Sequence, residues 1–207
     1  MVENGSLTLV ESLVTLYRLK NLKRAGWLRR GIPYHFCESV AGHSYRAAQA
    51  GFHYTQDLEM VKMLLFHDLA EAIVGDITPH DGVDPAQKRT LEIEAIGRIT
   101  APLPYGTRIM QLWQEFERGE TSRSRIARQV DKLDAAVMAL VYENRGFNVS
   151  EFYAYTRKRL QDPRLVNIFD ILLRREHNLP DSHRVYFRLL REARCNEARP
   201  ASYSHPT

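Results

Sequence analysis

The sequence predicts an all-α fold of about eight helices in one domain, residues 1–196, and three observations support this. Apolar residues recur at spacings of three and four in nearly every segment, which is the pattern of a helix with one buried face. No segment alternates polar and apolar residues between hairpin turns, so a sheet is not indicated. The 207 residues are 44% hydrophobic and 26% charged, without a composition shift or long linker, as in one globular domain.

The expected helices follow one another along the chain as apolar stripes, each of which we expect to be buried. The segment MVKMLLFHDLAEAIVGD, residues 60–76, is the most apolar and is expected to be a central helix. The first stripe comprises Leu7, Val10, Leu13, Val14 and Tyr17. The others lie in SVAGHSYRAAQAG (39–51) and in residues 91–99, 109–116, 126–141 and 165–173.

Glycine and proline residues separate these segments, at positions where helices usually end. From residue 197 onward the apolar stripe is lost, so residues 197–207 are expected to form a flexible tail. The breaks fall at Gly31 to Pro33, Gly75 to Gly82, Pro102 to Pro104, Gly119, Gly146, Pro163 and Pro180.

Composition excludes several classes of protein. No apolar run approaches the roughly 18 residues that a membrane span needs, and residues 1–11 lack the features of a signal peptide. The two cysteines, Cys37 and Cys195, belong to no paired pattern, so we expect reduced thiols and a cytoplasmic protein without a membrane partner.

Two histidines and two aspartates indicate a metal site. His67 and Asp68 are adjacent within the apolar segment 60–76, where an unpaired charge would be costly. His43 begins one helical segment and Asp131 lies in another. A lone histidine in such a segment is more often a hydrogen-bonded core residue, but this ordered set favours a mixed nitrogen and oxygen site for a divalent metal.

Two further carboxylates lie close to this set in the sequence. Glu71 follows His67 by four residues, so we expect it on the same helix face, and Asp76 follows Gly75 just past the expected helix end. Both are placed to orient or deprotonate a metal-bound water as catalytic groups. Metal-assisted hydrolysis is therefore the reaction class that the residues predict.

The order H…HD…D resembles the HD-domain superfamily of metal-dependent phosphohydrolases, and three segments are similar to its 5′-deoxynucleotidase branch. These segments are ESVAGHSYRAA, FHDLAEAIVGDITP and RQVDKLDAAVMALVYEN. The resemblance implies His43, His67, Asp68 and Asp131 as ligands of one divalent ion (Mn, Co, Fe, Mg, Zn or Ni) and Glu71 and Asp76 as catalytic carboxylates. It places the metal-binding core at about residues 38–145, and it implies phosphate release from a 5′-deoxynucleoside monophosphate and a homodimer.

The resemblance also implies substrate-binding residues, with Arg24 for phosphate, Trp27 for nucleotide orientation, and Thr78. Residues 12–37 hold six basic and no acidic residues, whereas residues 38–156 hold 17 acidic and 12 basic ones. Arg29 and Arg30 remain alternatives for phosphate, and a solvated charge cluster with Trp27 in the core is the competing interpretation. This division of charge favours a pocket for a small phosphorylated substrate over nucleic-acid binding.

The sequence leaves several roles open. Gly42 stands where the family usually has an acidic residue, which leaves the orientation of His43 uncertain. The roles of Arg46, Asp134 and Glu143 are undecided, and His80 is either a loop residue at the pocket or a ligand of a second metal. The alternatives to the leading function are a phosphatase for a modified nucleotide or oligophosphate, a di-iron oxygenase acting on an organophosphonate, and a basic nucleic-acid-binding or scaffold domain with a vestigial site.

Overall fold

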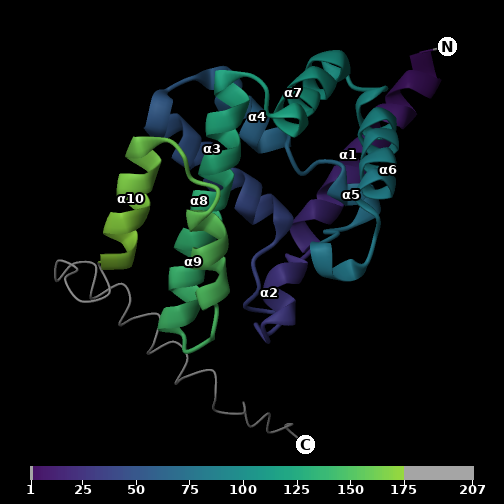
Figure 1. The fold of residues 1–207 in the computed structure, drawn as a ribbon. Helices are drawn as coiled ribbons and strands as arrows, with labels where there is room; N and C mark the ends of the chain where they lie inside the picture. Colours follow the sequence, from purple (N-terminus) through teal and green to yellow (C-terminus); the bar gives the residue numbers. More distant parts are fainter. Residues whose placement is uncertain (1, 175–207) are drawn as a thin grey trace, which may run out of the picture.

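The computed structural model describes residues 2–174, and side chains from residue 8 onward, as an assembly of helices (Figure 1). The all-α prediction is confirmed, since the described residues contain no strand. Within them, a single isolated β-bridge joins Lys23 and Ser39. The expected tail 197–207 and Cys195 lie outside the described residues. The helices are α1 (Val2–Asn21), α2 (Ala25–Arg29), α3 (Val40–Thr55), α4 (Leu58–Phe66), α5 (Glu71–Val74), the 3-10 helix η1 (Pro79–Asp81), α6 (Pro85–Thr100), α7 (Gly106–Arg118), α8 (Ser122–Asn144), α9 (Ser150–Arg157) and α10 (Pro163–Arg174).

Side-chain caps fix where the helices that carry the site begin. The Ser39 hydroxyl accepts the Gly42 N–H at the start of α3, and the Asp57 carboxylate accepts two backbone N–H groups at the start of α4. Thr121 and Ser124 cap α8 reciprocally. Each cap satisfies backbone donors that the helix itself leaves free, so α3, α4 and α8 begin at defined residues.

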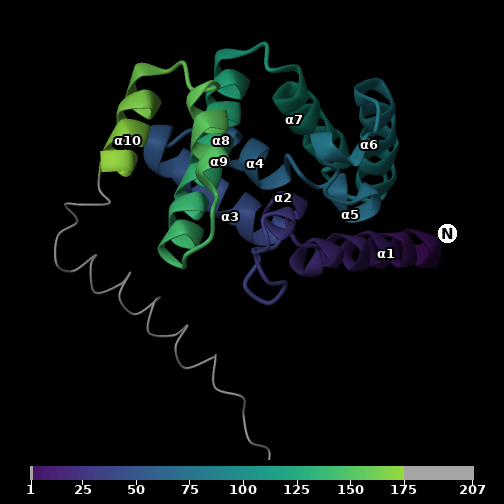
Figure 2. The same cartoon turned by 60° about the horizontal axis from the view of Figure 1, so that its bottom comes forward.

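Helices α3, α4 and α8 form the centre of the molecule. Helix α3 packs against α4 and α8, and α7 also packs against α4. Helices α1, α5 and α6 pack together at one end, and α9 and α10 lie against α8 at the other (Figures 1 and 2). Three clusters of buried apolar side chains fill the interior, around Leu64 on α4, Ile96 on α6 and Trp27 on α2.

The first stripe is the clearest failure of the sequence prediction. Val10, Leu13, Val14 and Tyr17 on α1 are 53%, 55%, 64% and 59% exposed, so the prediction that they are buried is wrong. Leu19 of the same helix is buried instead, next to the cluster around Ile96. Periodicity shows that a helix has an apolar face, but it does not show that this chain covers it.

The central segment is also different from the prediction of one helix over residues 60–76. Helix α4 ends at Phe66, and α5 begins only at Glu71, after a tight turn. Within the turn the Leu69 N–H donates to the Phe66 carbonyl and the Glu71 N–H to the Asp68 carbonyl. His67 and Asp68 therefore occupy a helix end, where side chains leave the apolar surroundings of α4 and face a pocket.

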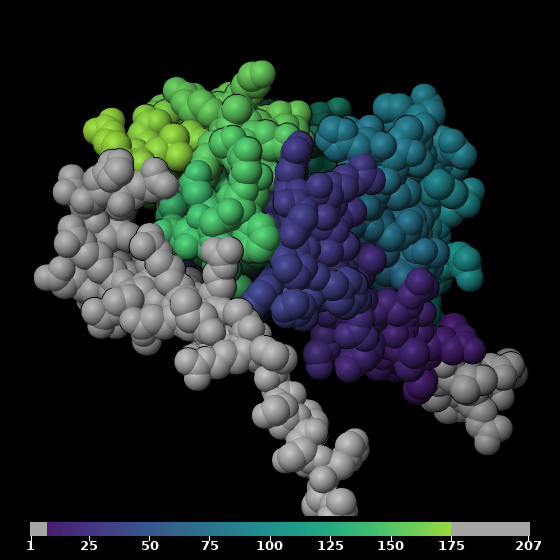
Figure 3. Space-filling model, turned by 90° about the horizontal axis from the view of Figure 1, so that it is seen from below, coloured from purple at the N-terminus to yellow at the C-terminus, as the bar shows by residue number. Residues whose placement is uncertain are grey.

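The short helix α2 lies between two halves of the molecule. Figure 3 shows this part of the chain, in indigo, between the green α8 and α9 and the blue α5 and α6. Arg29 forms an ion pair with Asp81 of η1 on one side, and Arg30 forms one with Glu151 of α9 on the other. None of the helices that the structure describes combines the length and the apolar character needed to cross a membrane.

Candidate metal centre

His43 lies in the first turn of α3 with its side chain 1% exposed, and both ring nitrogens have carboxylate partners. Nδ1 lies 2.8 Å from Asp134 Oδ2, and Nε2 lies 3.0 Å from Asp131 Oδ1. Burial and Arg24 lower the pKa of His43, but the bonds to Asp131 and Asp134 outweigh them and raise it to about 9. Nδ1–H donating to a carboxylate is the arrangement that orients a metal-binding imidazole.

His67 lies at the end of α4, and one of its nitrogens has no hydrogen-bond partner. Its Nδ1–H donates to the Leu64 carbonyl at 2.7 Å, which fixes the ring and leaves Nε2 as the free lone pair. Nε2 is fully buried and makes no hydrogen bond. A buried nitrogen without a partner is costly, and a metal ion is one group that satisfies it.

The four predicted ligands converge around this nitrogen. Asp68 Oδ2 lies 3.2 Å from His67 Nε2 and 3.8 Å from His43 Nε2, and Asp131 Oδ1 lies 3.8 Å from His67 Nε2. Burial alone would raise the pKa of Asp68, but His67 and Arg24 keep it well below its usual range. Two imidazole nitrogens, which lose their protons when a metal binds, and two carboxylates fit a divalent transition metal, so the residues present suit the predicted ion.

Glu71 and Asp76 lie on the pocket side of this set. Glu71 is 8% exposed and its Oε2 has no hydrogen-bond partner, while burial and the charges of Asp68 and Asp76 raise its pKa well above the ordinary value. Asp76 Oδ2 accepts the Ala25 N–H at 2.7 Å, so this residue also holds the start of α2. Glu71 thus holds a proton more readily than an ordinary carboxyl group does.

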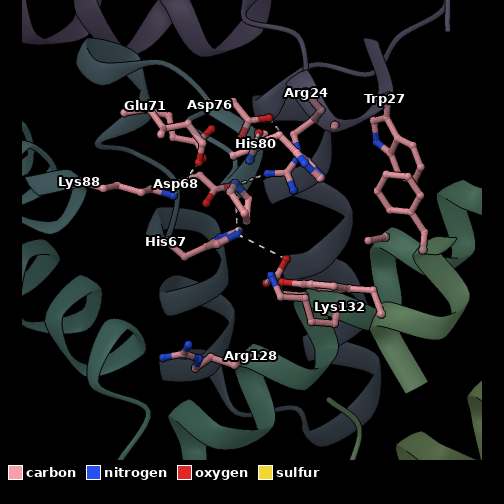
Figure 4. A pocket seen from close by; sticks show the side chains of 18 of the residues that line it. Arg24, Trp27, His67, Asp68, Glu71, Asp76, His80, Lys88, Arg128 and Lys132 are labelled. Atoms are coloured by element: carbon pink, nitrogen blue, oxygen red, sulfur yellow. Dashed lines mark hydrogen bonds and ion pairs between the residues drawn. The ribbon is translucent and has the colours of Figure 1, made fainter. Parts of the chain in front are cut away.

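A pocket of about 740 Å³ opens over these residues, and all three predicted substrate-binding residues line it. Arg24 Nη1 lies 3.0 Å from Asp68 Oδ2, and Figure 4 shows its guanidinium directed at the aspartate. Thr78 caps η1 with its hydroxyl bonded to Asp81. Trp27 is only 2% exposed, stacks on Phe152 and donates Nε1–H to Glu38, so it forms a fixed wall of the pocket.

Comparisons with known proteins bear on this arrangement. The family model described as HD domain matches residues 16–165, which is most of the chain. The chain belongs to the HD domain family. A human relative named 5'-deoxynucleotidase HDDC2 is 30% identical over 174 residues, covering 80% of this chain and 84% of that protein. The fission-yeast protein named 5'-deoxynucleotidase hdd1 is 33% identical, covering 83% of this chain and 92% of its own.

Solved structures share the fold. A conserved hypothetical protein from Pyrococcus furiosus superposes with a TM-score of 0.66 at 28% identity, covering 80% of this chain and 99% of that one. A protein from Pyrococcus horikoshii gives a TM-score of 0.67 at the same identity and coverage of this chain. The helical HD domain fold is therefore present over most of the residues described above.

Some residues of this HD domain site had no clear signal in the sequence. Lys132 Nζ lies 2.7 Å from Asp131 Oδ2, and Figure 4 shows it facing His67 from the side opposite Glu71. Lys88 and Arg128 also line the pocket, with Lys88 bonded to the Ile77 carbonyl and Arg128 to carbonyls at the end of α7. Only the position of Lys132 directly after a predicted ligand could have indicated a role.

The structure shows where the residues lie whose roles the sequence left open. Asp134 and Arg46 lie behind His43, so Gly42 does not deprive the imidazole of an orienting carboxylate in this HD domain. Glu143 accepts the Tyr153 hydroxyl and lies elsewhere. His80 is exposed on η1 and lines the pocket. Among residues 8–174, two groups of side chains could hold a metal ion, and His80 belongs to neither of them. One group is His43, His67 and Asp68, and the other is Glu38, His43 and Asp134.

Proposed function

We propose that this HD domain is a metal-dependent phosphohydrolase that releases phosphate from a nucleotide, specifically a 5′-deoxynucleoside monophosphate. The observation that carries the proposal is the convergence of Asp68, Asp131 and His43 around Nε2 of His67, a buried atom without a hydrogen-bond partner that lies beside a pocket. Relatives that cover most of the chain carry the name 5'-deoxynucleotidase, which supports the substrate class.

The chemistry that a divalent ion supplies at such a site is polarisation of a phosphoryl oxygen and of a water molecule. The side chains of this protein do the remaining work. Arg24 stays charged beside Asp68 and Asp76 and would hold the phosphate oxygens by charge-assisted hydrogen bonds. Glu71, when ionised, would accept the proton of the attacking water, and its raised pKa makes it a stronger base than an ordinary carboxylate. Asp76 keeps Arg24 in place by fixing the start of α2.

The fixed wall around Trp27 and the polar residues at the pocket mouth would hold the nucleoside. Thr78 at the start of η1 and Tyr155 of α9, which is 42% exposed, both line this pocket. These groups can exclude water from one side of the phosphate and set its orientation. We propose Trp27 and Thr78 as binding residues on this ground.

A phosphate-release screen tests the proposal. Purified protein is incubated with deoxyribonucleoside and ribonucleoside mono-, di- and triphosphates in the presence of Mn²⁺, Co²⁺, Mg²⁺, Zn²⁺ or Ni²⁺. We expect release from deoxyribonucleoside monophosphates, and its loss in Asp131→Ala. Release confined to oligophosphates would assign a different phosphatase, and consumption of oxygen with two bound irons would refute hydrolysis.

We further propose that the protein is cytoplasmic and that it forms a homodimer through α1. Val10, Leu13, Val14 and Tyr17 form an exposed apolar stripe on α1, and an antiparallel second copy would set the Glu11 of one chain near the Arg18 of the other. We expect sedimentation to show a dimer for the wild-type protein and a monomer for Leu13→Glu. A monomeric wild-type protein would refute the pairing.

A further inference from the structure

A hydrogen-bonded cluster lies on the Nδ1 side of His43, away from the atoms that converge on the metal position. Asp134 Oδ2 accepts from His43 Nδ1 at 2.8 Å and from Arg46 Nη2 at 2.8 Å. Asp134 Oδ1 accepts from Arg46 Nε at 3.1 Å. The guanidinium of Arg46 therefore holds both oxygens of the carboxylate that orients His43, in a two-point geometry that fixes its plane.

The same guanidinium reaches a second carboxylate. Arg46 Nη2 donates to Glu38 Oε2 at 2.7 Å, and the other oxygen of Glu38 accepts Trp27 Nε1–H at 2.5 Å. Hydrogen bonds thus run without a gap from Trp27 in the pocket wall to His43 at the metal position. Arg46 is the link between the two halves of this chain of contacts.

The burial of the two carboxylates explains why a cation is required between them. The side chains of Glu38 and Asp134 are both 5% exposed, whereas that of Arg46 is 33% exposed. Two buried carboxylates without a cation would repel each other, and each would seek a proton or a new partner. Removing Arg46 would free Asp134 to rotate away from His43 and free Glu38 to release the indole of Trp27.

We propose that Arg46 is a positioning residue that sets the metal ligand His43 and the pocket wall Trp27 together, by bridging Asp134 and Glu38. This inference rests on the proposed metal site. Arg46 does not line the pocket and does not contact the ligand atoms of the proposed metal site. By this inference it nevertheless controls both the metal affinity and the position of Trp27. Loss of this orientation is expected to lower metal affinity by about 10- to 100-fold.

The chain offers a closely matched control. Arg123 also bridges two carboxylates, with Nε 2.8 Å from Asp57 and Nη1 3.8 Å from Glu115, and its side chain is 35% exposed. It makes no contact with His43, Glu38 or Trp27. Arg46→Met and Arg123→Met therefore remove the same side chain at similar exposure, but the carboxylates that Arg123 contacts are more exposed, at 35% and 21%.

The experiment measures Co²⁺ affinity by titration of the metal-free protein, followed by visible absorption. Indole fluorescence is recorded in a Trp113→Phe background, where Trp27 is the remaining tryptophan of the two in the chain. We expect Arg46→Met to lower Co²⁺ affinity by about tenfold or more and to shift the Trp27 emission, with Arg123→Met behaving as wild type. Arg46→Lys keeps the charge without the two-point geometry, so its affinity should lie between those of wild type and Arg46→Met.

Three results would overturn the inference: wild-type Co²⁺ affinity in Arg46→Met, equal losses in Arg46→Met and Arg123→Met, or an unchanged Trp27 emission in Arg46→Met. Failure of the metal site itself is recognised separately with Asp68→Ala, which removes a proposed ligand. If that variant binds Co²⁺ as wild type does, the proposed function is wrong. If it loses Co²⁺ while Arg46→Met does not, only the role of Arg46 is wrong.

Discussion

Replacing Gly51 by alanine tests whether close packing of α3 on α4 sets the geometry of the metal centre. Gly51 lies on α3, where an added Cβ would come within 2.5 Å of Leu64 Cδ1 and 3.3 Å of Met60 Cε on α4. Leu64 is fully buried, so it has little room to move aside. Alanine gains about 1 kcal/mol of helix propensity over glycine, but overpacking costs about 1–3 kcal/mol. The net change is a loss of stability of up to about 2 kcal/mol.

Gly97→Ala is the matched control for this substitution. Gly97 lies near the end of α6, as Gly51 does in α3, but its added Cβ would meet only Met110 Cε, at an ordinary 3.8 Å. This variant should gain the propensity term alone, about 0.5–1 kcal/mol. Urea unfolding followed by circular dichroism gives both free energies of unfolding.

The same substitution has a consequence for the metal centre. Helix α3 carries His43 and α4 leads to His67, and the two rings are 5.3 Å apart between centroids. Separation of the helices by the new methyl group should therefore lower Co²⁺ affinity in Gly51→Ala and leave it unchanged in Gly97→Ala. If Gly51→Ala stabilises the protein as much as Gly97→Ala does, the helices are not in close contact here and the reasoning is refuted.

Three further predictions concern a helix cap and the reaction. Asp57→Ala should lower stability at neutral pH by about 1 kcal/mol. Burial alone would raise the pKa of Asp57, but hydrogen bonds from Arg123 and two backbone N–H groups lower it. The stability that Asp57 contributes is therefore present above the ordinary pKa of 3.8 and is lost as pH falls through the lowered pKa. If urea unfolding still shows a difference between Asp57→Ala and wild type below this range, the ionised carboxylate is not the stabilising group. Glu71→Gln should slow phosphate release by about 100-fold or more with the metal content of wild type, and a parallel loss of metal would show that Glu71 is a ligand instead. Arg24→Met should raise the KM for the nucleotide by about tenfold or more, and an unchanged KM in steady-state kinetics would remove Arg24 from the phosphate site.

The helical class and the candidate ligands His67 and Asp68 could be predicted because they depend on local patterns. Spacings of three and four residues mark helices wherever a face is apolar, and His67 next to Asp68 within an apolar segment requires a partner. The sequence also indicates Glu71 and Asp76, because both lie in the same segment as His67 and Asp68. These features need no knowledge of how distant helices pack.

The rest depends on contacts between distant segments. The exposed stripe of α1, with Leu13 and Val14, could not be told from a buried one, since periodicity is the same in both cases. The turn between α4 and α5 was missed because its residues are individually compatible with a helix. Arg46 is 88 residues from Asp134 in the sequence, so nothing local indicates that it orients the carboxylate behind His43.

The metal content of the purified protein tests the central claim most directly. Elemental analysis of wild type, Asp131→Ala and the surface control Arg123→Met compares metal per chain after loading with Mn²⁺ or Co²⁺ and removal of excess ion. We predict one tightly bound ion per chain in wild type and in Arg123→Met, and none in Asp131→Ala. Stoichiometric metal in Asp131→Ala would contradict the claim that His43, His67, Asp68 and Asp131 hold the ion.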